Sequence, residues 1–534
     1  MALITSSVDA VLFFLCSWLV YKVSKRLLNP AKTIRLRGPP SPSWVFGVGR
    51  YISDQPDSGP VYEKWASEYG PVYEVPAGFG KRKVILTDPK AISHFYAKET
   101  TTYVHSPNGK LVIESIVGRG LLWADGDSHK RRRKALTPAF SNAAIRRLTS
   151  VFYDSAYKLK EGWDSMLQTS SSDEIIIDVQ RWMNRVSLDS IGIAGFGHDF
   201  GALRGKTSTV AEVFDAFNAI RPSFLAIVGF ILGPIFPFLV YLPTERKALT
   251  TRWTENVAEM SAQLLERTKK ADEAGVKAEE KSLMGLLLKA ENADSDLRMT
   301  EDEIMAQMKV LILAGYETTS ISLTWALVEL CKKPELQAKL REELLSRSGA
   351  SDPTWDQLTS ELPYLDSVVH ETLRLHVPVD QSGRITTEDD IIPLTAPITT
   401  ASGETIDRLP VRKGTLVTVP INCMNTSDAI WGPDAKEFKP ERWLDNGKGI
   451  PSRAQEIQGH RHLLTFVDGQ RICLGRAFAL AEFKAVLSVL IRNYTFEFAG
   501  GPSTQVEKVR AMLPRPQVVG ETECRIPMRI GRVQ

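Results

Sequence analysis

Cysteine is scarce in this chain, which has five among 534 residues. They are scattered without paired spacing, so the sequence predicts neither a disulfide framework nor a zinc site, and it favours a reducing compartment. Charge of one sign is also lacking, since 66 lysines and arginines stand against 63 aspartates and glutamates. A nucleic-acid binder needs a strong basic excess, so that class is excluded. No G-x-G-x-x-G fingerprint follows a predicted strand, so a dinucleotide-binding unit is not expected.

Long apolar runs are few, and the first lies at the N-terminus. Residues 2–21 are largely apolar, and twenty residues just span a hydrocarbon core. Three lysines and arginines follow in residues 22–26, so the positive-inside rule keeps the C-terminal side cytosolic. A cleaved signal peptide would carry its charges before the run. Residues 1–26 are therefore predicted to be a retained membrane anchor, followed by a proline-rich linker over 27–48.

A second run, residues 223–242, carries no charge. Two glycines and the prolines Pro234 and Pro237 interrupt it, and prolines remove helix hydrogen bonds that lipid cannot replace. Two short apolar helices that dip into the bilayer surface are the favoured interpretation, with a second transmembrane span as the alternative.

Most of the remaining chain has the apolar spacing of helices, and two stretches have the composition of strands. Helices are predicted over 141–168, 249–270, 301–331, 355–376 and 476–494. Strands are predicted within 72–88 and 384–420.

Cys473 lies in the segment F-V-D-G-Q-R-I-C-L-G, residues 466–475, just before an apolar run with helical spacing. Unpaired N–H groups and the helix dipole at a helix N-terminus lower the pKa of a thiol. The thiolate is the form that ligates iron, and a cysteine axial ligand on haem favours O–O cleavage. A lone cysteine is more often a buried structural residue, so the assignment depends on its neighbours.

Four neighbours fit a haem site around Cys473. Gly469 allows a positive φ, and Gly475 lets the chain approach a flat ring closely. Arg471 is suited to pair with a propionate, and Phe466 to pack against the macrocycle. Together they favour iron ligation by Cys473 over a structural role.

The segment 466–475 matches the pattern F-x-x-G-x-R-x-C-x-G, so the chain resembles a cytochrome P450. Val467 is a departure, because the family usually has a small or polar residue there. The resemblance covers everything after the linker. It implies one catalytic domain over 49–534, mainly α-helical with a small β-sheet region, and haem b with the Cys473 thiolate as axial ligand.

A second match to the family is A-G-Y-E-T, residues 314–318. Ala314 and Thr318 share a helix face, where a small residue lets a flat cofactor lie against the helix. Gly315 weakens the helix, and Thr318 can bond a carbonyl one turn back, opening space for water or O2. Glu317 supplies a carboxylate for protons. By itself the segment also fits a core helix, but the resemblance implies catalytic roles for Thr318 and Glu317 and cofactor contacts for Ala314 and Gly315.

Three structural residues are implied by the resemblance as well. Glu371 and Arg374 lie three apart on one helix, and Arg442 follows at the family's distance. A buried triad of this kind is implied to brace the haem-binding core.

Propionate contacts are implied for three residues. Arg133 and His129 share a helix face, and His129 stands where the family usually has tryptophan. Arg384 matches a further propionate-binding position. The nearby Arg131, Arg132 and Lys134 are predicted to form a basic patch on the cysteine side, where an electron donor would dock.

The resemblance implies a haem-thiolate monooxygenase of a eukaryotic, fungal type, in the endoplasmic reticulum membrane with a cytosolic catalytic domain. It would use NADPH-derived electrons and O2 to hydroxylate or epoxidise a lipophilic small molecule, in secondary metabolism or xenobiotic oxidation. The implied electron donor is NADPH–cytochrome P450 reductase, with cytochrome b5 as a second candidate. An O2-independent isomerase or dehydratase, a peroxygenase and a non-catalytic haem sensor are the alternatives.

Overall fold

The computed structural model describes residues 17, 34–219, 244–273, 282–285, 299–349 and 351–533. The predicted anchor over 2–21 and the apolar stretch 223–242 lie outside the described residues, apart from residue 17. The same holds for the first part of the linker, 27–33.

The helices predicted from apolar spacing are confirmed, with one difference. A continuous helix was expected over 355–376, but a short π-helical turn, η5 (Gln357–Glu361), precedes the α-helix there. Pro363 explains the division, because proline lacks the N–H that would continue the helix and is tolerated in a first turn. The long helices of the body are α7 (Asn142–Thr169), α8 (Val179–Phe196), α11 (Glu245–Glu273), α13 (Glu301–Lys332), α14 (Pro334–Ser348), α15 (Pro363–Leu375) and α20 (Arg476–Asn493).

Side-chain caps fix where several of these helices begin. The Thr300 hydroxyl accepts the Glu303 N–H, and the Glu303 carboxylate accepts the Thr300 N–H, which makes a capping box at the start of α13. Ser141 accepts the Ala144 N–H at the start of α7.

The strands lie in two small sheets and two hairpins. A five-stranded sheet has the order β1-β2-β8-β5-β3, and a three-stranded sheet has the order β4-β12-β9. The hairpins are β6-β7 and β10-β11. The strands are β1 (Val72–Pro76), β2 (Arg82–Leu86), β3 (Tyr103–Val104), β4 (Glu174–Asp178), β5 (Ser382–Thr386), β6 (Asp390–Thr399), β7 (Thr405–Val411), β8 (Leu416–Val419), β9 (Tyr494–Phe498), β10 (Val506–Val509), β11 (Arg515–Val518) and β12 (Pro527–Arg532).

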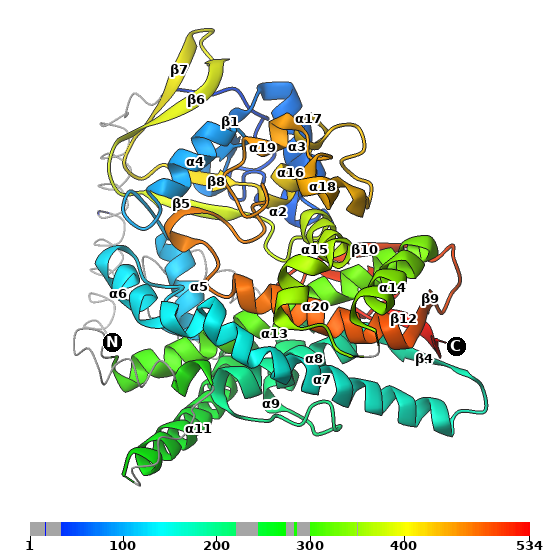
Figure 1. Ribbon diagram of the computed structural model, residues 1–534. Coiled ribbons are helices and arrows are strands. Elements are labelled where there is room, and N and C mark those ends of the chain that lie inside the picture. The colour runs from blue at the N-terminus through cyan, green and yellow to red at the C-terminus, as the bar shows by residue number, and fades with distance from the viewer. Residues whose placement is uncertain are drawn as a thin grey trace, which may run out of the picture.

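The molecule divides into a part that contains the five-stranded sheet and a mainly helical part that also holds the three-stranded sheet. In Figure 1 the five-stranded sheet lies in the upper part with α3 (Gly59–Tyr69) and α4 (Pro89–Ala97), and α7, α8, α13 and α20 lie below it. The largest apolar cluster belongs to the helical part. This arrangement confirms the expected mainly helical fold with small sheets.

Helix α13 runs through the centre of the helical part and packs against α8, α11, α15 and α20. Of the described helices it is the one long and apolar enough to cross a membrane, but 67% of its most apolar window is buried inside the protein. Burial of this kind is ordinary for a core helix. The packing sets α13 beside α20, the helix that follows Cys473.

Candidate active site

The segment before α20 is a closed loop that presents Cys473. The Cys473 N–H donates to the Phe466 carbonyl oxygen at 2.9 Å, so the two ends of the loop meet. Gly469 has φ +66°, and a Cβ on it would lie 2.2 Å from the Tyr96 carbonyl oxygen, so only glycine fits. The predicted need for positive φ at Gly469 is confirmed.

Val467, the departure from the family pattern, also has a positive φ of +50°. A β-branched residue in the left-handed region is strained by about 1–3 kcal/mol. Its side chain packs against the apolar cluster that contains Trp443 and Leu464, which offsets part of that cost.

The thiol of Cys473 is accessible, although protein surrounds it closely. Burial raises the pKa of Cys473, and the Gly475 N–H together with Arg133 and Arg476 lowers it by a smaller amount. The N–H group near the helix N-terminus lowers this pKa as predicted, but the net pKa is raised because burial outweighs it. Cys473 precedes the first residue of α20 by three positions, so desolvation of the sulfur exceeds the effect of the helix end. A cation bound to the sulfur would reverse that balance.

The site residues predicted on α13 lie on different faces of the helix. The Thr318 hydroxyl donates to the Ala314 carbonyl oxygen at 2.6 Å, as expected, and both side chains have accessible surface within a largely buried helix. The helix is nevertheless continuous from Glu301 to Lys332, so no break accompanies this bond.

Gly315 does not face the same way as Ala314. A Cβ on Gly315 would lie 2.7 Å from Cγ1 of Ile191 on α8. The glycine therefore permits close packing of α13 against α8. Its predicted contact with the cofactor is not supported, because the Cα–Cβ direction of Gly315 points at Ile191 on α8.

Glu317 is fully buried and held by an arginine from the C-terminal hairpin. Arg515 Nη2 on β11 lies 2.5 Å from Glu317 Oε1, and Arg515 Nη1 lies 3.8 Å from Asp215 of α9 (Thr209–Ala219). Burial lowers the pKa of Arg515, but Glu317, Tyr316 and Asp215 together raise it by more, so the net pKa is above its usual value. Arg515 was not found from the sequence, because it lies 198 residues from Glu317 and has no local motif.

The residues predicted to bind propionates converge beside the cysteine loop. Arg133 Nη1 donates to the Ile472 carbonyl oxygen at 2.6 Å. Arg471 Nη2 lies 2.5 Å from Asp125 Oδ1, and Arg384 Nη2 lies 2.5 Å from Glu99 Oε1. Burial, together with the charges of Arg471 and Arg133, lowers the pKa of His129 to about 4. His129 is therefore a neutral donor at neutral pH.

Two further residues belong to this cluster. His105 is buried, and burial with the charges of Arg384 and Arg471 holds the pKa of its ring far below the usual range. Among the described residues, His105 Nε2, Trp123 Nε1, Arg384 Nε and Arg471 Nε are buried without a hydrogen-bond partner. A lone histidine and a lone tryptophan carry no sequence signal, so neither was found in advance.

These buried donors are the test of whether haem fits. Unpaired buried N–H groups are costly, and a cluster of them with two arginines suits a pair of carboxylates. Gly475 fits too, because a Cβ there would meet no protein atom closer than Phe140 Cε1 at 3.8 Å. The thiol, the donor cluster and the small side chain of Ala314 form a suitable set for an iron porphyrin with two propionates.

The predicted basic patch for an electron donor is not supported. Arg131 Nη2 and Arg132 Nη2 lie 2.5 Å and 2.6 Å from the same oxygen, Oε1 of Glu303. Arg132 is 6% exposed. The two arginines instead tie α6 (Gly126–Leu136) to the capping box of α13, so much of their charge is neutralised within the protein.

The predicted structural triad is confirmed. Arg374 and Glu371 are completely buried, with Arg374 Nη2 at 2.8 Å from Glu371 Oε1 and Arg374 Nε at 2.9 Å from Oε2. Arg442 Nε lies 3.3 Å from Glu371 Oε1.

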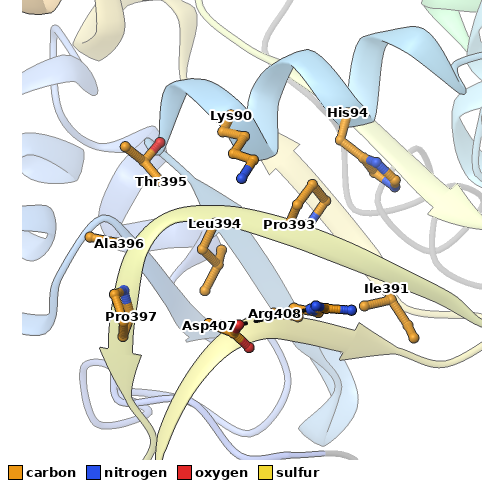
Figure 2. A pocket seen from close by; sticks show the side chains of 10 residues that line it. All are labelled: Lys90, His94, Ile391, Pro393, Leu394, Thr395, Ala396, Pro397, Asp407 and Arg408. Carbon is orange, nitrogen blue, oxygen red and sulfur yellow. Dashed lines mark ion pairs between the residues drawn. The ribbon is translucent and has the colours of Figure 1, made fainter.

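A surface pocket of the described residues lies apart from this site. Figure 2 shows it between α4 and the β6-β7 hairpin, with Lys90 and His94 above the hairpin. Its volume is about 490 Å³, and it contains none of the predicted site residues. A second pocket of about 350 Å³ lies at the start of α13 and includes Glu303, Ala306 and Lys309. This second pocket lies about 12 Å along α13 from Ala314, because Ala306 in its lining is eight residues before Ala314.

Three features together define a haem-thiolate protein. They are a cysteine loop whose two ends are joined by a hydrogen bond, a central helix with an acid–threonine pair, and a buried Glu–Arg–Arg triad. The family model for cytochrome P450 matches residues 37–519. The chain therefore belongs to the cytochrome P450 family, an enzyme family that uses haem with a cysteine thiolate ligand.

Fungal P450 monooxygenases match nearly the whole chain. The cytochrome P450 monooxygenase claQ of Ampulloclitocybe clavipes is 57% identical over 98% of both chains, and claO of the same fungus is 57% identical over 98% of both. The cytochrome P450 monooxygenase 128 of Postia placenta is 34% identical over 95% of this chain and 94% of its own. The protein is accordingly a P450 monooxygenase.

Proposed function

We propose that Cys473 is the axial ligand and that the enzyme uses NADPH-derived electrons to hydroxylate or epoxidise a lipophilic small molecule. The observation that carries the proposal is the accessible Cys473 thiol, at the end of a closed loop beside buried donors that lack protein partners. Haem bound there supplies O2 activation and the oxidising chemistry. The protein supplies ligation, orientation, proton delivery and exclusion of water.

Different residues would hold the two ends of the cofactor. Arg133, Arg384, Arg471, His129 and the newly found His105 supply positive charge and N–H groups for the propionates. Ala314 on α13 would present a small side chain to the porphyrin ring. Phe466 packs near the cysteine loop, where its ring meets His460 edge-on at 6.0 Å between centroids.

Proton delivery is assigned to Thr318 and Glu317. The Thr318 hydroxyl hydrogen bonds to the Ala314 carbonyl, which leaves the oxygen lone pairs able to accept from water. Glu317 Oε1 is held by Arg515, so this ion pair fixes how the carboxylate is oriented relative to Thr318 and to a water beside it. Arg515 is therefore a positioning residue that sets how readily Glu317 takes part.

The intact pair Glu317–Thr318 favours O2-dependent chemistry over the alternatives. An O2-independent isomerase or dehydratase and a haem sensor have no need for a carboxylate and hydroxyl at this point, and a peroxygenase is distinguished by its lack of NADPH and O2 consumption. The buried ion pair with Arg515 argues against a sensor, since an unused buried charge is costly to retain.

The wider setting of the enzyme is proposed from the sequence. Residues 1–26 would anchor it in the endoplasmic reticulum membrane, 27–48 would form the linker, and 49–534 the cytosolic catalytic domain. NADPH–cytochrome P450 reductase, or cytochrome b5 as a second donor, would bind on the cysteine side at a surface other than Arg131 and Arg132. The role would be in secondary metabolism or xenobiotic oxidation, and the fungal relatives named monooxygenases support the monooxygenase activity.

Reconstitution tests this function. The full chain in lipid, with a fungal NADPH–cytochrome P450 reductase, is screened with lipophilic metabolites for a substrate-induced change in haem spin state. Substrates that shift the spectrum are then incubated with NADPH and 18O2. One labelled oxygen atom per product molecule is expected, and conversion of the same substrates without O2 would instead establish an isomerase.

Thr318→Ala is expected to uncouple the enzyme. Haem content and substrate binding should be nearly unchanged, whereas the share of NADPH electrons that ends in peroxide should rise and product per NADPH should fall roughly tenfold or more. The reason is that Thr318 holds a proton path and has no part in binding the cofactor. Product and hydrogen peroxide are measured per NADPH consumed.

Thr318→Ser is the matched control, because it keeps the hydroxyl. Coupling in this variant should stay close to that of the wild type. Equal coupling in the alanine variant and the wild type would remove Thr318 from the mechanism.

Arg515→Met should lower coupled turnover by a different route. It leaves the Glu317 carboxylate buried without its counter-charge, which changes both its orientation and its proton affinity. The pH profile of kcat and the solvent deuterium isotope effect should both change, and Arg515→Lys should restore part of the wild-type profile. A stability loss with an unchanged pH profile would mean that Arg515 is structural alone.

A further inference from the structure

One buried carboxylate beside the propionate-binding residues has no role in the function proposed above. Glu99 is 1% exposed and follows α4, although Ala97 and Thr101 on either side of it in the chain are exposed. Arg384 Nη2 lies 2.5 Å from Glu99 Oε1, but neither Glu99 oxygen accepts a well-aligned hydrogen bond from the described residues. A buried carboxylate in this state is costly to keep ionised.

The backbone fixes Glu99 beside the cysteine loop. The Glu99 N–H donates to the Tyr96 carbonyl oxygen at 3.3 Å. The next residue, Thr100, donates its N–H to the Tyr103 carbonyl oxygen at 2.9 Å and its hydroxyl to Gln470 Oε1 at 2.7 Å. Because Gln470 belongs to the cysteine loop, these bonds hold Glu99 next to the haem-binding residues.

The second carboxylate of this cluster, Asp125, has more cations of its own. Its two oxygens lie 2.5 Å from Arg471 Nη2 and 2.6 Å from Lys110 Nζ. Glu99 has an ion pair with Arg384 alone, and this arginine is also assigned to a propionate. A bound propionate would draw on the same guanidinium, so the charge of Glu99 is the less compensated of the two.

Groups from several elements act on the Glu99 carboxylate. They are Arg384 of β5, Arg471 of the cysteine loop, Asp125 before α6 and Tyr96 of α4. Burial raises the pKa of Glu99, and the charges of Arg384 and Arg471 offset only part of that increase. Burial and the charge of Glu99 raise the pKa of Tyr96 far above its usual range, so the phenol is neutral at neutral pH.

We propose that Glu99 takes up a proton when the haem is reduced, and that it thereby sets how electron uptake depends on pH. One electron passes from the electron donor to the haem iron and one proton passes from solvent to a Glu99 oxygen, so the net charge of the cluster is unchanged. An uncompensated charge in a buried site is unfavourable. Glu99 acts through Arg384 and the propionates, which makes it a positioning residue, and the inference rests on the proposed haem site at Cys473.

The test is a spectroelectrochemical titration of the full chain with its haem and without substrate. In the wild type, the ratio of reduced to oxidised haem at a fixed potential should fall roughly threefold or more between about pH 5 and about pH 8, since ionised Glu99 opposes added negative charge. Glu99→Gln should raise the ratio at the alkaline end and remove most of the pH dependence. Glu388→Gln changes an exposed glutamate, so this matched control should keep the wild-type dependence.

An equal pH dependence in Glu99→Gln and the wild type would overturn the proposal and leave Glu99 as a brace for Arg384 alone. If Glu99→Gln does not retain haem, infrared difference spectra of the wild type decide. Reduction should produce a protonated-carboxyl band that stays in place when the haem carries 13C in its propionate carboxyls. The absence of this band, or a band that moves with the label, would also overturn the proposal.

The haem ligand is checked on the same samples. The red-shifted band of the reduced carbon monoxide complex reports ligation by Cys473 and should be present in both Glu99→Gln and Glu388→Gln. A normal band together with a pH dependence unchanged in Glu99→Gln would refute the role of Glu99 alone. A wild type without the band would refute the proposed ligand instead.

Discussion

Cys473→Ser is expected to abolish the red-shifted absorption band of the reduced carbon monoxide complex and with it all NADPH-dependent turnover. The band reports a thiolate ligand in the carbon monoxide complex. The serine hydroxyl stays protonated at neutral pH, so it cannot replace the thiolate as a ligand. The Cys473 N–H bond to the Phe466 carbonyl does not involve the side chain, so the loop should keep its shape. The spectrum, haem content and turnover are measured on the same preparation.

Cys524→Ser provides the matched control, since Cys524 is half-buried and its sulfur lies 3.8 Å from the Gln517 amide oxygen on β11. This variant should retain the band and full turnover. Circular dichroism checks that Cys473→Ser is folded. A band retained in Cys473→Ser and lost on substitution of another cysteine would refute the ligand assignment.

The elements of the helical body could be predicted because their signals are local. Apolar spacing predicted α7, α11, α13 and α20 within a few residues, and the strand-like stretches contain β1, β2 and β6 to β8 and overlap β5. The helix α8 was not predicted, although it lines one side of α13. Its 18 residues are buried on nearly every face, and buried polar residues such as Asn184, Ser187 and Asp189 interrupt the apolar spacing on which such predictions depend.

The site was predictable where a motif is contiguous and less so where it depends on helix rotation or distant contacts. The cysteine loop and the bond from Thr318 to Ala314 follow from neighbouring residues. Gly315 was placed wrongly because the neighbour that fills its face, Ile191, comes from α8. Arg515 and His105 reach the site from remote segments, and nothing in their local sequence marks them.

Electrostatics was the least predictable part, because burial decides it. The helix end was expected to govern the Cys473 thiol, yet desolvation raises its pKa. Arg131 and Arg132 were expected at the surface as a docking patch, yet the capping glutamate of α13, Glu303, engages both. Charge counts along a sequence do not show which charges are already paired.

The buried triad should give the largest change in stability of any single substitution considered for this protein. The Glu371 carboxylate is 0% exposed and accepts bonds from Arg374, Arg442, the Lys439 N–H and the Trp443 ring N–H. Glu371→Gln leaves the buried Arg374 guanidinium without its counter-charge, whereas Arg442 keeps its ion pair with Asp434 at 2.8 Å. Breaking a buried pair in this way costs about 3–5 kcal/mol.

The loss should extend to the haem site, because the triad is joined to the cysteine loop. Arg374 donates to the Asn425 carbonyl oxygen at 3.0 Å, and the Asn425 side chain donates to Thr465 Oγ1 at 2.8 Å, one residue before Phe466. Glu371→Gln should therefore lower haem content as well as the urea midpoint. Both are measured on the purified full chain, together with soluble yield.

Glu342→Gln on α14 is the control, since Glu342 is exposed and its substitution should change stability by no more than about 0.5 kcal/mol. Arg442→Lys keeps the charge and should fall between the control and Glu371→Gln. If Glu371→Gln proves too unstable to purify, Arg442→Lys still reports a lowered midpoint and reduced haem content. A midpoint for Glu371→Gln equal to that of Glu342→Gln would show that the triad does not brace the haem-binding core, since a carboxylate with four buried donors would then be replaceable by an uncharged amide.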